Sequence, residues 1–559
     1  MRRNVRDIAR LTRRRFLVAG AGVVAVAAGI GVARDPIRDL LRDDPASEMP
    51  PKGDFPPPRR IRDCSAPANR VVAENCRPGS EGWRMTRVDG RIEGFFDLPS
   101  VGRGEEATIR VGCEDPEYRI EIYRSGYYEG ARGRLVERTA SIAADPQPEP
   151  RRHEPTGLVS AANWTVSARF DTSDWPSGVY LAKLVSSGGS EGQAILVVRE
   201  DDRPADALLF ISDTTYQAYN YWGDYSLYAG DDGSPRAVRV SYDRPYINVR
   251  VDQADWYLRN ELPLVSWLEG EGYDVTYAAA SDAHRRPERL GRRRAWLSGA
   301  HNEYASDEMR DAFERRRDEG VGLAFFGANS FYWRVRFEPD PWSGEPDRVM
   351  VCYKSSEETP TTLGPGPVED PVSRTSLWRD PRGPDRPENA LIGVMYAGQD
   401  LVANHPLVVP GRTFHDDPLW RGADGAGAAG AQPVAIGQEL VGWEWDAVAD
   451  NGQTPAGLRR LSATPVEGTV MDARGGLSTG SAVANAATYT APSGAVVFAS
   501  GSNLFTWGLD DYGFRLYSGG HPQGEPDQRI QQLVTNALAA MGCRPGSPAV
   551  DLRTPDASA

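Results

Sequence analysis

The chain has 559 residues, which corresponds to about 3–4 domains of ordinary size. Its content of 40% hydrophobic and 25% charged residues is that of a globular protein. A formal net charge of -14 argues against nucleic-acid binding, because phosphate recognition needs clustered Lys and Arg.

Residues 1–34 resemble a twin-arginine export signal. The stretch T-R-R-R-F-L begins at Thr12, and an apolar run extends from Phe16 to Ala33. Small residues at 25–28 offer a cleavage site, whereas an uncleaved run is close to the shortest segment that anchors a protein in a membrane. We therefore expect export by the twin-arginine route to a secreted, periplasmic or cell-surface location, with or without membrane anchoring.

Residues 35–80 are rich in Pro, Arg and Asp and are predicted to be a linker that wraps a domain. Cys64 and Cys76 lie close together in this segment, and an exported protein can oxidise them, so we expect a disulfide. The other cysteines have no metal-like spacing and are expected to be buried free thiols: Cys113, Cys352 and Cys543.

Residues 81–203 contain short alternating segments such as YRIEIYRSGYY, GVYLAKLVSS and GQAILVVRED, separated by Gly, Pro and Asp turns. This spacing predicts an antiparallel β-sandwich. The stretch WPSGVYLAKL is typical of a late strand in an immunoglobulin-like or fibronectin-like domain.

Residues 204–545 alternate between buried strands and helices. ALLFIS (207–212) is a continuous apolar strand, and LPLVSWLEGEG (262–272) is a helix that ends at glycine. Ser306 is placed to cap a second helix, which Gly320 ends. The pattern predicts an α/β domain with a parallel sheet and right-handed crossovers.

Three further segments complete the predicted organisation. Residues 340–430 carry many Pro, Gly and Asp residues and are expected to form long ordered loops over the sheet. Residues 527–542 are predicted to be a closing amphipathic helix. Residues 546–559 are expected to be a disordered tail.

The stretch SGAHNEY places His301, Glu303 and Tyr304 where a predicted strand meets a helix. Open α/β sheets usually bind their ligands at such junctions. Cysteine is missing from this junction and its surroundings in the sequence, so thiolate catalysis has no candidate here.

Eight motifs occur in one order along the chain: TTYQAYNYWGDYSLY, LPLVSWLEGEGYDV, SGAHNEYASDEMRDAF, GLAFFGANSFYWRVRFE, DRVMVCYK, RPENALIGVMY, LVGWEWD and GSNLFTWGLDD. Together they resemble the C-terminal catalytic region of the large subunit of N,N-dimethylformamidase. The upstream stretch from GFFDLPSVGRGEEATIRV resembles the sandwich that precedes that region, so the similarity covers about residues 80–545. The resemblance implies an α/β domain similar to class I glutamine amidotransferases after an immunoglobulin-like or fibronectin-like sandwich.

The resemblance also implies a mononuclear Fe(III) site built from two tyrosines and a glutamate. Carried over by motif, the ligands are Tyr180 of SGVYLAKL, Tyr219 of QAYN and Glu303 of HNEY. A phenol with a pKa of about 10 binds a cation at neutral pH only when that cation is hard and strongly Lewis-acidic. With only 6 histidines scattered along the chain, a His-based zinc site is hard to assemble.

Three more residues are candidates for catalysis. His301 is expected to support the metal or carry protons, and the resemblance makes Asn329 a residue that hydrogen-bonds substrate or an oxyanion. Glu444 of GWEWD is a candidate general acid or base, with Glu439 as its competitor. Tyr304 is expected to pack under the loop.

These inferences predict an exported amidohydrolase that cleaves the C–N bond of a small amide. One alternative is a non-catalytic exported protein that binds a carbohydrate or cell-wall polymer through Trp222, Tyr225 and Trp333. Another is a metal-free hydrolase. The resemblance also allows a small partner subunit or a homo-oligomer.

Overall fold

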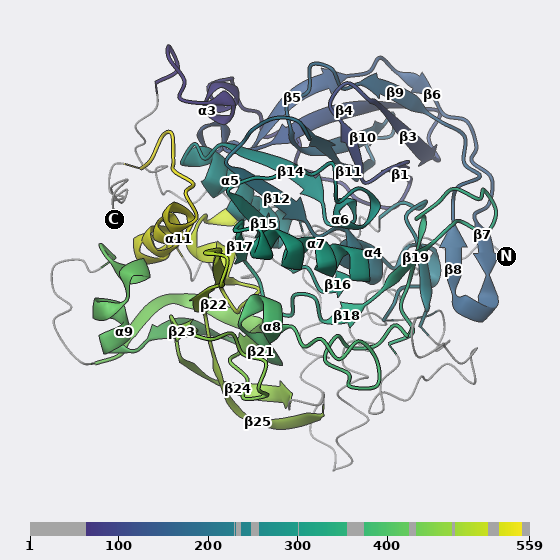
Figure 1. Cartoon of the computed structure of the whole chain (residues 1–559). Helices are drawn as coiled ribbons and strands as arrows, with labels where there is room; N and C mark the ends of the chain where they lie inside the picture. The colour runs from purple at the N-terminus through teal and green to yellow at the C-terminus, as the bar shows by residue number, and fades with distance from the viewer. Residues whose placement is uncertain are drawn as a thin grey trace.

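The computed structural model describes residues 63–228, 230, 236–246, 257–299, 301–354, 374–423, 432–471, 476–512 and 525–549. The predicted signal and the linker up to residue 62 lie outside the described residues, as does the tail from residue 550. No helix in the described part is long and apolar enough to cross a membrane. The structure combines several β-sheets with shorter helices (Figure 1).

Two sheets packed face to face form the N-terminal part (Figure 1). One has the order β1-β3-β9, and the other has the order β2-β11-β10-β4-β5, with β6 beside β4. Inward-facing apolar residues of both sheets, among them Ile109, Ile122 and Leu184, share one core. The strands are β1 (Ile92–Phe96), β2 (Ser100–Gly102), β3 (Glu106–Cys113), β4 (Glu117–Ser125), β5 (Gly133–Arg138), β6 (Ile142–Ala143), β9 (Ala168–Asp171), β10 (Gly178–Ser186) and β11 (Glu191–Arg199). Their likeness to immunoglobulin or fibronectin domains stays a prediction.

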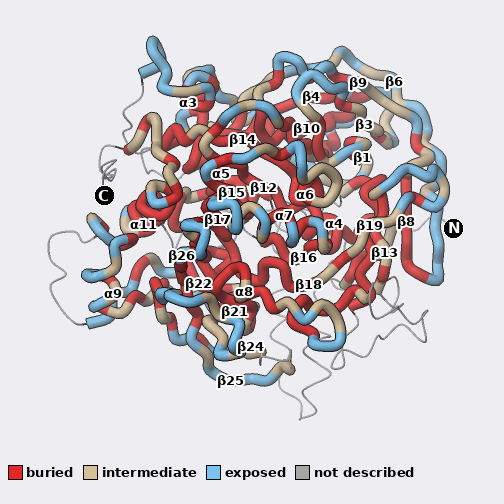
Figure 2. Tube along the Cα trace, in the orientation of Figure 1, coloured by how far each residue is buried: buried red, intermediate tan, exposed pale blue. Residues whose placement is uncertain are grey.

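The central sheet has the order β14-β12-β15-β17-β27-β26-β23. Its first five strands are parallel, which confirms the predicted parallel sheet, and the last two are antiparallel. Its strands are β12 (Ala207–Ile211), β14 (Val275–Ala279), β15 (Ala295–Ser298), β17 (Gly322–Phe325), β23 (Arg459–Arg460), β26 (Ala487–Thr490) and β27 (Val496–Ala499). The parallel strands are buried almost throughout (Figure 2), because both faces of the sheet are covered.

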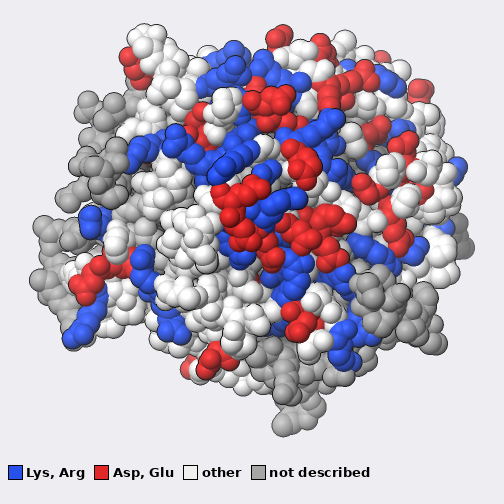
Figure 3. Space-filling view, viewed as in Figure 1, with Lys and Arg blue, Asp and Glu red and all other residues white. Residues whose placement is uncertain are grey.

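Short helices lie between the strands of this sheet, and a further helix follows its last strand in the chain. They are α4 (Asp213–Tyr219), α5 (Leu262–Gly270), α6 (Asp282–Arg285), α7 (Asp307–Asp318) and α11 (Gln528–Ala540), with a π-helical turn (Tyr257–Glu261) before α5. The predicted cap of α7 is confirmed, since the Ser306 hydroxyl accepts a hydrogen bond from Met309 N at 3.3 Å. Acidic and basic side chains are interspersed over the face shown in Figure 3.

A second, four-stranded sheet with the order β22-β21-β24-β25 lies below the central sheet in Figure 1. Its strands are β21 (Met395–Val409), β22 (Val434–Ala447), β24 (Thr464–Met471) and β25 (Leu477–Ala484). The span predicted as long loops, 340–430, therefore contains β21 and the helices α8 (Asn389–Ile392) and α9 (Gly411–Asp416). Smaller pairings involve β7 (Arg151–His153), β8 (Leu158–Ser160), β13 (Arg239–Ser241), β16 (Tyr304–Ala305), β18 (Trp333–Arg334), β19 (Arg336–Glu338) and β20 (Val349–Val351).

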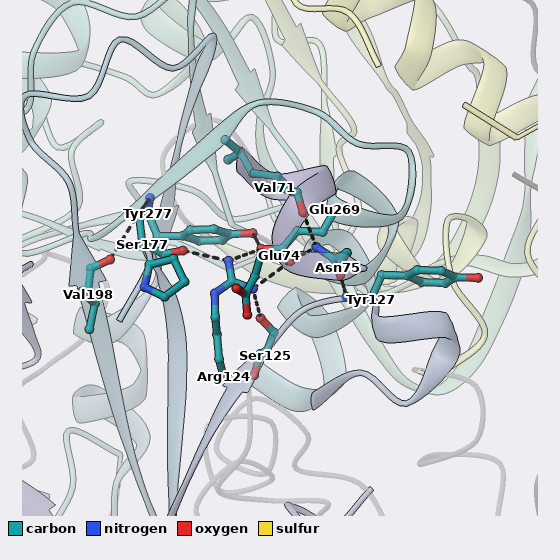
Figure 4. Close-up of polar contacts among 12 residues, drawn as sticks. Val71, Glu74, Asn75, Arg124, Ser125, Tyr127, Ser177, Val198, Glu269 and Tyr277 are labelled. Atoms are coloured by element: carbon teal, nitrogen blue, oxygen red, sulfur yellow. Dashed lines mark hydrogen bonds and ion pairs between the residues drawn. The ribbon is translucent and has the colours of Figure 1, made fainter. Parts of the chain in front are cut away.

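A buried ion pair joins the sandwich to the α/β part (Figure 4). Arg124 on β4 donates to both carboxylate oxygens of Glu269 on α5, at 2.7 and 2.9 Å. Tyr277 OH donates to the same carboxylate at 2.8 Å, and so does Asn75 Nδ2. The two parts are therefore docked through a carboxylate whose oxygens are both hydrogen-bonded.

The N-terminal end of the described chain packs onto this junction. The predicted disulfide between Cys64 and Cys76 is confirmed, and it flanks helix α3 (Arg70–Asn75). Asn75 Oδ1 accepts the backbone N–H groups of Tyr127 and Tyr128 in the sandwich. The described end of the predicted linker thus fastens both parts of the molecule.

The described part of the predicted tail is ordered by contacts with the end of α5. Gly546 N donates to the carbonyl of Gly272, and Ser547 N donates to that of Glu271. Ala549 N donates to the Glu271 carboxylate at 2.6 Å. The prediction of a disordered tail is wrong for residues 546–549, because these backbone groups have partners within the fold.

Candidate active site

The candidate site lies at the carboxyl ends of the parallel strands. β12 leads into α4, which carries Tyr219; β15 leads to His301 and Glu303; β17 leads to Asn329; and β27 leads to Asn503. After β12 the chain forms β14 on one side of it and then β15 on the other, so the strand order reverses between β12 and β15. Open α/β sheets bind ligands in the crevice at such a reversal.

One buried histidine lies between two buried carboxylates. Nε2 of His301 is 3.3 Å from Oε2 of Glu303 and 3.4 Å from Oε2 of Glu444. Its Nδ1 is 3.3 Å from the carbonyl oxygen of Ala328, which orients the ring. A cluster of this kind can hold a proton and pass it on.

The surroundings push the acidities of the two carboxylates apart. Burial, reinforced by the charge of Glu303, raises the pKa of Glu444 to about 7. Burial also acts to raise the pKa of Glu303, but His301, Lys354 and Tyr228 outweigh it and hold that pKa below its ordinary value. For His301, burial favours the neutral ring, but Glu444 and Glu303 raise its pKa. Glu303 is therefore ionised at neutral pH, whereas Glu444 can exchange a proton.

Three phenols gather around Glu303. Tyr228 OH donates to Oε1 of Glu303 at 2.7 Å, and Tyr304 OH donates to the Tyr228 hydroxyl at 2.6 Å. The Tyr219 ring stacks on the Tyr228 ring with 4.2 Å between centroids. Burial, followed by the charge of Glu303, raises the pKa of each phenol well above its usual value. Without a bound cation the three hydroxyls therefore stay protonated.

A buried lysine adds a positive charge beside these rings. Nζ of Lys354 lies 3.4 Å from the ring centroid of Tyr228, 5.1 Å from that of Trp333 and 5.4 Å from that of Tyr304. Burial lowers the pKa of Lys354 to about 7, although Glu303 opposes the shift. Lys354 is thus both a cation–π partner and a group that titrates near neutrality.

The turn after β17 is fixed by side chains from two other elements. Ala328 N donates to Asn503 Oδ1 at 2.9 Å, and Asn329 N donates to Asp446 Oδ1 at 2.8 Å. Asn503 Nδ2 in turn donates to Oε2 of Glu444 at 2.9 Å. Asn329 has a φ of 56°, and its buried Oδ1 has no hydrogen-bonding partner within the described part of the chain. These two backbone N–H groups are therefore occupied, while one side-chain acceptor is left open.

Aromatic side chains line the more accessible side of the cluster. Tyr219, Tyr228 and Trp443 are half-buried, whereas His301 and Glu303 are buried. The Trp443 ring lies 5.7 Å from the His301 ring. The half-buried side of the cluster is therefore aromatic, with the Arg259 guanidinium 4.4 Å from the centroid of the Trp443 ring.

A family model described as N,N-dimethylformamidase beta subunit-like, C-terminal, matches residues 119–520, which include the whole cluster. This chain belongs to that family. The N,N-dimethylformamidase beta subunit of Paracoccus aminophilus is 31% identical over 154 residues, and that of Alcaligenes sp is 30% identical over 154 residues. Each match covers 26% of this chain and only 19% of the relative.

Most of the residues predicted for a dimethylformamidase-like site come together in the structure. Tyr219, His301 and Glu303 are neighbours, and Glu444 joins them through His301. Asn329 joins through its side-chain hydrogen bond to Glu444, which acts to lower the pKa of that carboxyl. Glu444 contacts His301, whereas Glu439 is half-buried elsewhere on β22.

Tyr180 is the exception, and the structure contradicts its predicted place in the site. It lies in the core between the two sheets of the sandwich, where its ring stacks on Trp175 with centroids 4.8 Å apart. Its hydroxyl donates to the carbonyl of Pro176 at 2.6 Å. The motif SGVYLAKL thus identifies an inward-facing strand position whose tyrosine fills the core.

Sequence reasoning missed four members of the cluster: Tyr228, Lys354, Asp446 and Asn503. Tyr228 ends the tyrosine-rich stretch that contains Tyr219, and Asn503 follows a buried strand, so both carried a local signal. Lys354 and Asp446 end the motifs DRVMVCYK and LVGWEWD, but nothing in the sequence indicated that these motifs meet at the site.

The side chains of the cluster include oxygen donors that could bind a metal ion. Among the described residues, no group of three or more His, Cys, Asp and Glu side chains could hold one. Phenolic oxygens would have to contribute, and the Tyr219 hydroxyl lies within hydrogen-bonding reach of both Tyr228 and Glu303. Oε2 of Glu303 is buried and has no hydrogen-bonding partner within the described residues. Two phenols and this carboxylate are hard donors that fit Fe(III) better than Zn(II).

Proposed function

We propose that the chain is an exported amidohydrolase that cleaves the C–N bond of a small amide with the help of Fe(III). One observation carries the proposal: the Tyr219 and Tyr228 hydroxyls meet the Glu303 carboxylate directly beside the His301–Glu444 pair. The relatives named N,N-dimethylformamidase beta subunits support a hydrolase that acts on amide C–N bonds.

In this proposal Tyr219, Tyr228 and Glu303 hold the ion, and Tyr228 replaces Tyr180 as the second phenolic donor. Bound Fe(III) supplies a Lewis acid that polarises an amide carbonyl and acidifies a water. The phenol hydroxyls lose their protons when a trivalent cation faces them, since nearby positive charge favours the phenolate.

Glu444 and His301 move protons around the reacting amide. With a pKa of about 7, Glu444 takes a proton from the attacking water and later gives it to the leaving nitrogen. His301 lies between Glu444 and Glu303, so its imidazolium form balances the negative charge of both carboxylates. Asn503 orients the Glu444 carboxylate through its 2.9 Å hydrogen bond.

The side chain of Asn329 positions the substrate. The backbone N–H groups of Ala328 and Asn329 already donate to Asn503 and Asp446, so neither is available to a tetrahedral oxyanion. The left-handed backbone at Asn329 instead presents a carboxamide whose Oδ1 is open to an incoming donor. Charge that develops on the amide oxygen must therefore be met by a cation or a side chain rather than by these amides.

A metal-free hydrolase is the second candidate, and Lys354 is the observation that favours it. Its ammonium lies over the phenol rings and acts on Glu303, so it supplies positive charge to the site without an ion. In that case the phenols stay neutral and donate hydrogen bonds, and the protein has no visible colour.

The polymer-binding alternative receives less support. Trp222 is buried against Trp164, and Trp333 is buried beside Tyr332. Of the three aromatic residues proposed for such a surface, only Tyr225 is half-buried. Exposed rings are what a carbohydrate platform needs, and these rings pack inside the fold.

Export and partners complete the proposal. The twin-arginine pattern supports export of the folded protein, and the Cys64–Cys76 disulfide suits an oxidising compartment. Because the matched relatives are named as beta subunits, a small partner subunit or a second copy of the chain is part of the proposal.

The deciding experiment measures iron content, visible absorption and amide hydrolysis on purified protein from iron-replete cells. We expect a tinted protein with about one iron per chain, because ferric phenolates absorb visible light. Tyr219→Phe and Tyr228→Phe should each lose the colour and the hydrolysis of formamide, N-methylformamide or N,N-dimethylformamide. A colourless, iron-free protein that hydrolyses these amides would establish the metal-free mechanism, and one that hydrolyses none of them would contradict the amidohydrolase.

A further inference from the structure

Arg244 is a fully buried arginine in the loop after β13, and it is bonded to main-chain carbonyls. Nη2 donates to the carbonyls of Gln217 and Asn220, both at 3.0 Å. Nη1 donates to the carbonyls of Trp222 at 3.2 Å and Tyr225 at 2.9 Å. One guanidinium thus binds four main-chain carbonyls of a single segment. That segment begins in the last turn of α4 and continues beyond the helix.

This segment, Gln217–Tyr225, has little regular structure of its own. It contains the last turn of α4 and then an irregular turn with φ values of 76° at Gly223 and 72° at Asp224. The last carbonyls of a helix have no partners within the helix, so they need donors from elsewhere. Arg244 supplies such a donor to the carbonyl of Gln217, and its positive charge is favourable at a helix C-terminus.

Side chains of the segment Gln217–Tyr225 also donate hydrogen bonds back to the residues around Arg244. Asn220 Nδ2 donates to the carbonyl of Pro245 at 2.9 Å, and Gln217 Nε2 donates to Tyr246 OH at 3.0 Å. Nε of Arg244 lies 3.4 Å from Oε1 of Gln217. The path of the chain around Tyr219 is therefore fixed by contacts with residues 244–246 on both sides of that tyrosine.

Within the described part of the chain no carboxylate pairs with Arg244, which sets it apart from the other fully buried arginines. Arg124 and Arg199 face Glu269 and Asp282, and Arg310 is bonded to Glu314. Burial of a cation without a counter-ion is costly, and carbonyl dipoles offset only part of that cost. A neutral side chain would be the simpler choice if the loop only had to be filled.

We propose that Arg244 is the positioning residue that fixes segment 217–225 and, with it, the Tyr219 hydroxyl beside Glu303. This inference rests on the proposed function in one respect, namely that Tyr219 is a ligand of the site. The guanidinium acts through the backbone and touches neither substrate nor metal. Its planar fork reaches four carbonyls at once, which the single ammonium of a lysine cannot do.

The test uses Arg244→Lys, which keeps the charge and most of the side-chain stem but loses the fork. Arg310→Lys is the matched control: Arg310 is also buried and donates to two main-chain carbonyls, those of Arg386 and Pro387, from helix α7. Two readouts are compared. One is the affinity of the full-length protein for Fe(III), and the other is backbone hydrogen exchange across residues 213–228 of the metal-free protein.

For Arg244→Lys we expect iron affinity to fall roughly 10–100-fold, as it does when residues that support metal ligands are lost. Exchange should become faster at the amides of Trp222 and Leu227, whose acceptors, Asn220 Oδ1 and the carbonyl of Ala218, lie within the held segment. Arg310→Lys should leave both quantities at wild-type values. Unchanged iron affinity together with unchanged exchange across 213–228 in Arg244→Lys would overturn the inference.

The two proposals fail separately. If the wild-type protein binds no iron but Arg244→Lys still exchanges faster across 213–228, the iron site is wrong and the positioning role of Arg244 stands. If Arg244→Lys does not fold, Gln217→Leu takes its place, because it removes the side-chain acceptor of Arg244 Nε, together with the contacts of Gln217 with Asn220 Nδ2 and Tyr246 OH. Faster exchange confined to 213–228 in that variant supports the inference, and wild-type exchange there contradicts it.

Discussion

Two buried carboxylates of this protein, Glu269 and Glu303, have opposite surroundings. Both oxygens of Glu269 accept hydrogen bonds, from Arg124, Asn75 and Tyr277, and the group joins the sandwich to the α/β part (Figure 4). Glu303 has one oxygen bonded to Tyr228, and its other oxygen has no hydrogen-bonding partner within the described residues.

The difference in hydrogen bonding indicates that Glu269 serves mainly the stability of the fold, whereas Glu303 is available for ligand binding. A buried carboxylate whose donors are complete has no capacity left for a ligand, and removal of one partner leaves a costly unpaired charge. A buried carboxylate whose second oxygen faces the His301 imidazole, placed where the strand order of the sheet reverses, has capacity left for a cation or a substrate. Substitutions at the two places should therefore affect different measurements.

The largest expected effect is on catalysis at Glu303. Glu303→Gln should lower amide hydrolysis by about 10⁴-fold, because the ion would lose its carboxylate ligand and several kcal/mol of transition-state stabilisation. The melting temperature of the metal-free variant should fall only modestly, because glutamine keeps an acceptor for Tyr228 but loses the charge that His301 and Lys354 face. Steady-state kinetics measures the loss of hydrolysis, and calorimetry measures the melting temperature. A Glu303→Gln protein that is unfolded but keeps its activity per folded molecule would show that Glu303 serves stability rather than catalysis.

The next effect is on stability at the domain junction. Arg124→Met should destabilise the protein by about 3–5 kcal/mol, because Glu269 would be left buried without its cation. Activity per folded molecule should change by less than about 2-fold, and denaturant titration measures the loss. The double variant Arg124→Met/Glu269→Leu should recover much of it, since both charged groups are then gone. A double variant as unstable as the single one would show that packing around Arg124, rather than the ion pair, holds the junction.

A smaller effect concerns the pH dependence that Glu444 confers. Its pKa of about 7 means that the base form is scarce below neutrality, so wild-type kcat/KM should rise with pH and level off above about pH 7. Glu444→Gln should lower the plateau by about 10²–10³-fold and abolish the rise. Glu439→Gln is the matched control on the same strand and should keep both. A rise that persists in Glu444→Gln belongs to another group.

Local patterns in the sequence predicted the parts of the fold that depend on neighbouring residues. The Ser306 cap, the buried strand at 207–211 and the Cys64–Cys76 disulfide each need only residues close in sequence, and each is present. His301 and Glu303 were also accessible, because a polar stretch at the end of a buried strand lies at the sheet edge wherever the strand itself lies.

Tertiary packing decided what the sequence could not predict. Lys354 reaches the cluster from the segment after β20, and Asp446 reaches it from β22; periodicity does not indicate which distant segments meet. The Pro, Gly and Asp content around β21 favoured loops, but long-range pairing with β22 made it a strand. Tyr180 shows the converse error, since a tyrosine on an inward-facing strand position fills a core by default.

The weakest effect is expected at Tyr180, because the sandwich should contribute no ligand to the site. Tyr180→Phe removes only the hydrogen bond to the Pro176 carbonyl, which is worth about 1 kcal/mol. We expect a melting temperature lowered by a few degrees, with iron content, visible absorption and amide hydrolysis unchanged, since the phenol lies between the two sheets of the sandwich, stacked on Trp175. Tyr228→Phe, which removes a phenol bonded to Glu303, is the paired variant and should lose all three. Loss of iron in Tyr180→Phe with retention in Tyr228→Phe would return the second phenolic ligand to the sandwich and would require the two parts of the molecule to rearrange around the ion.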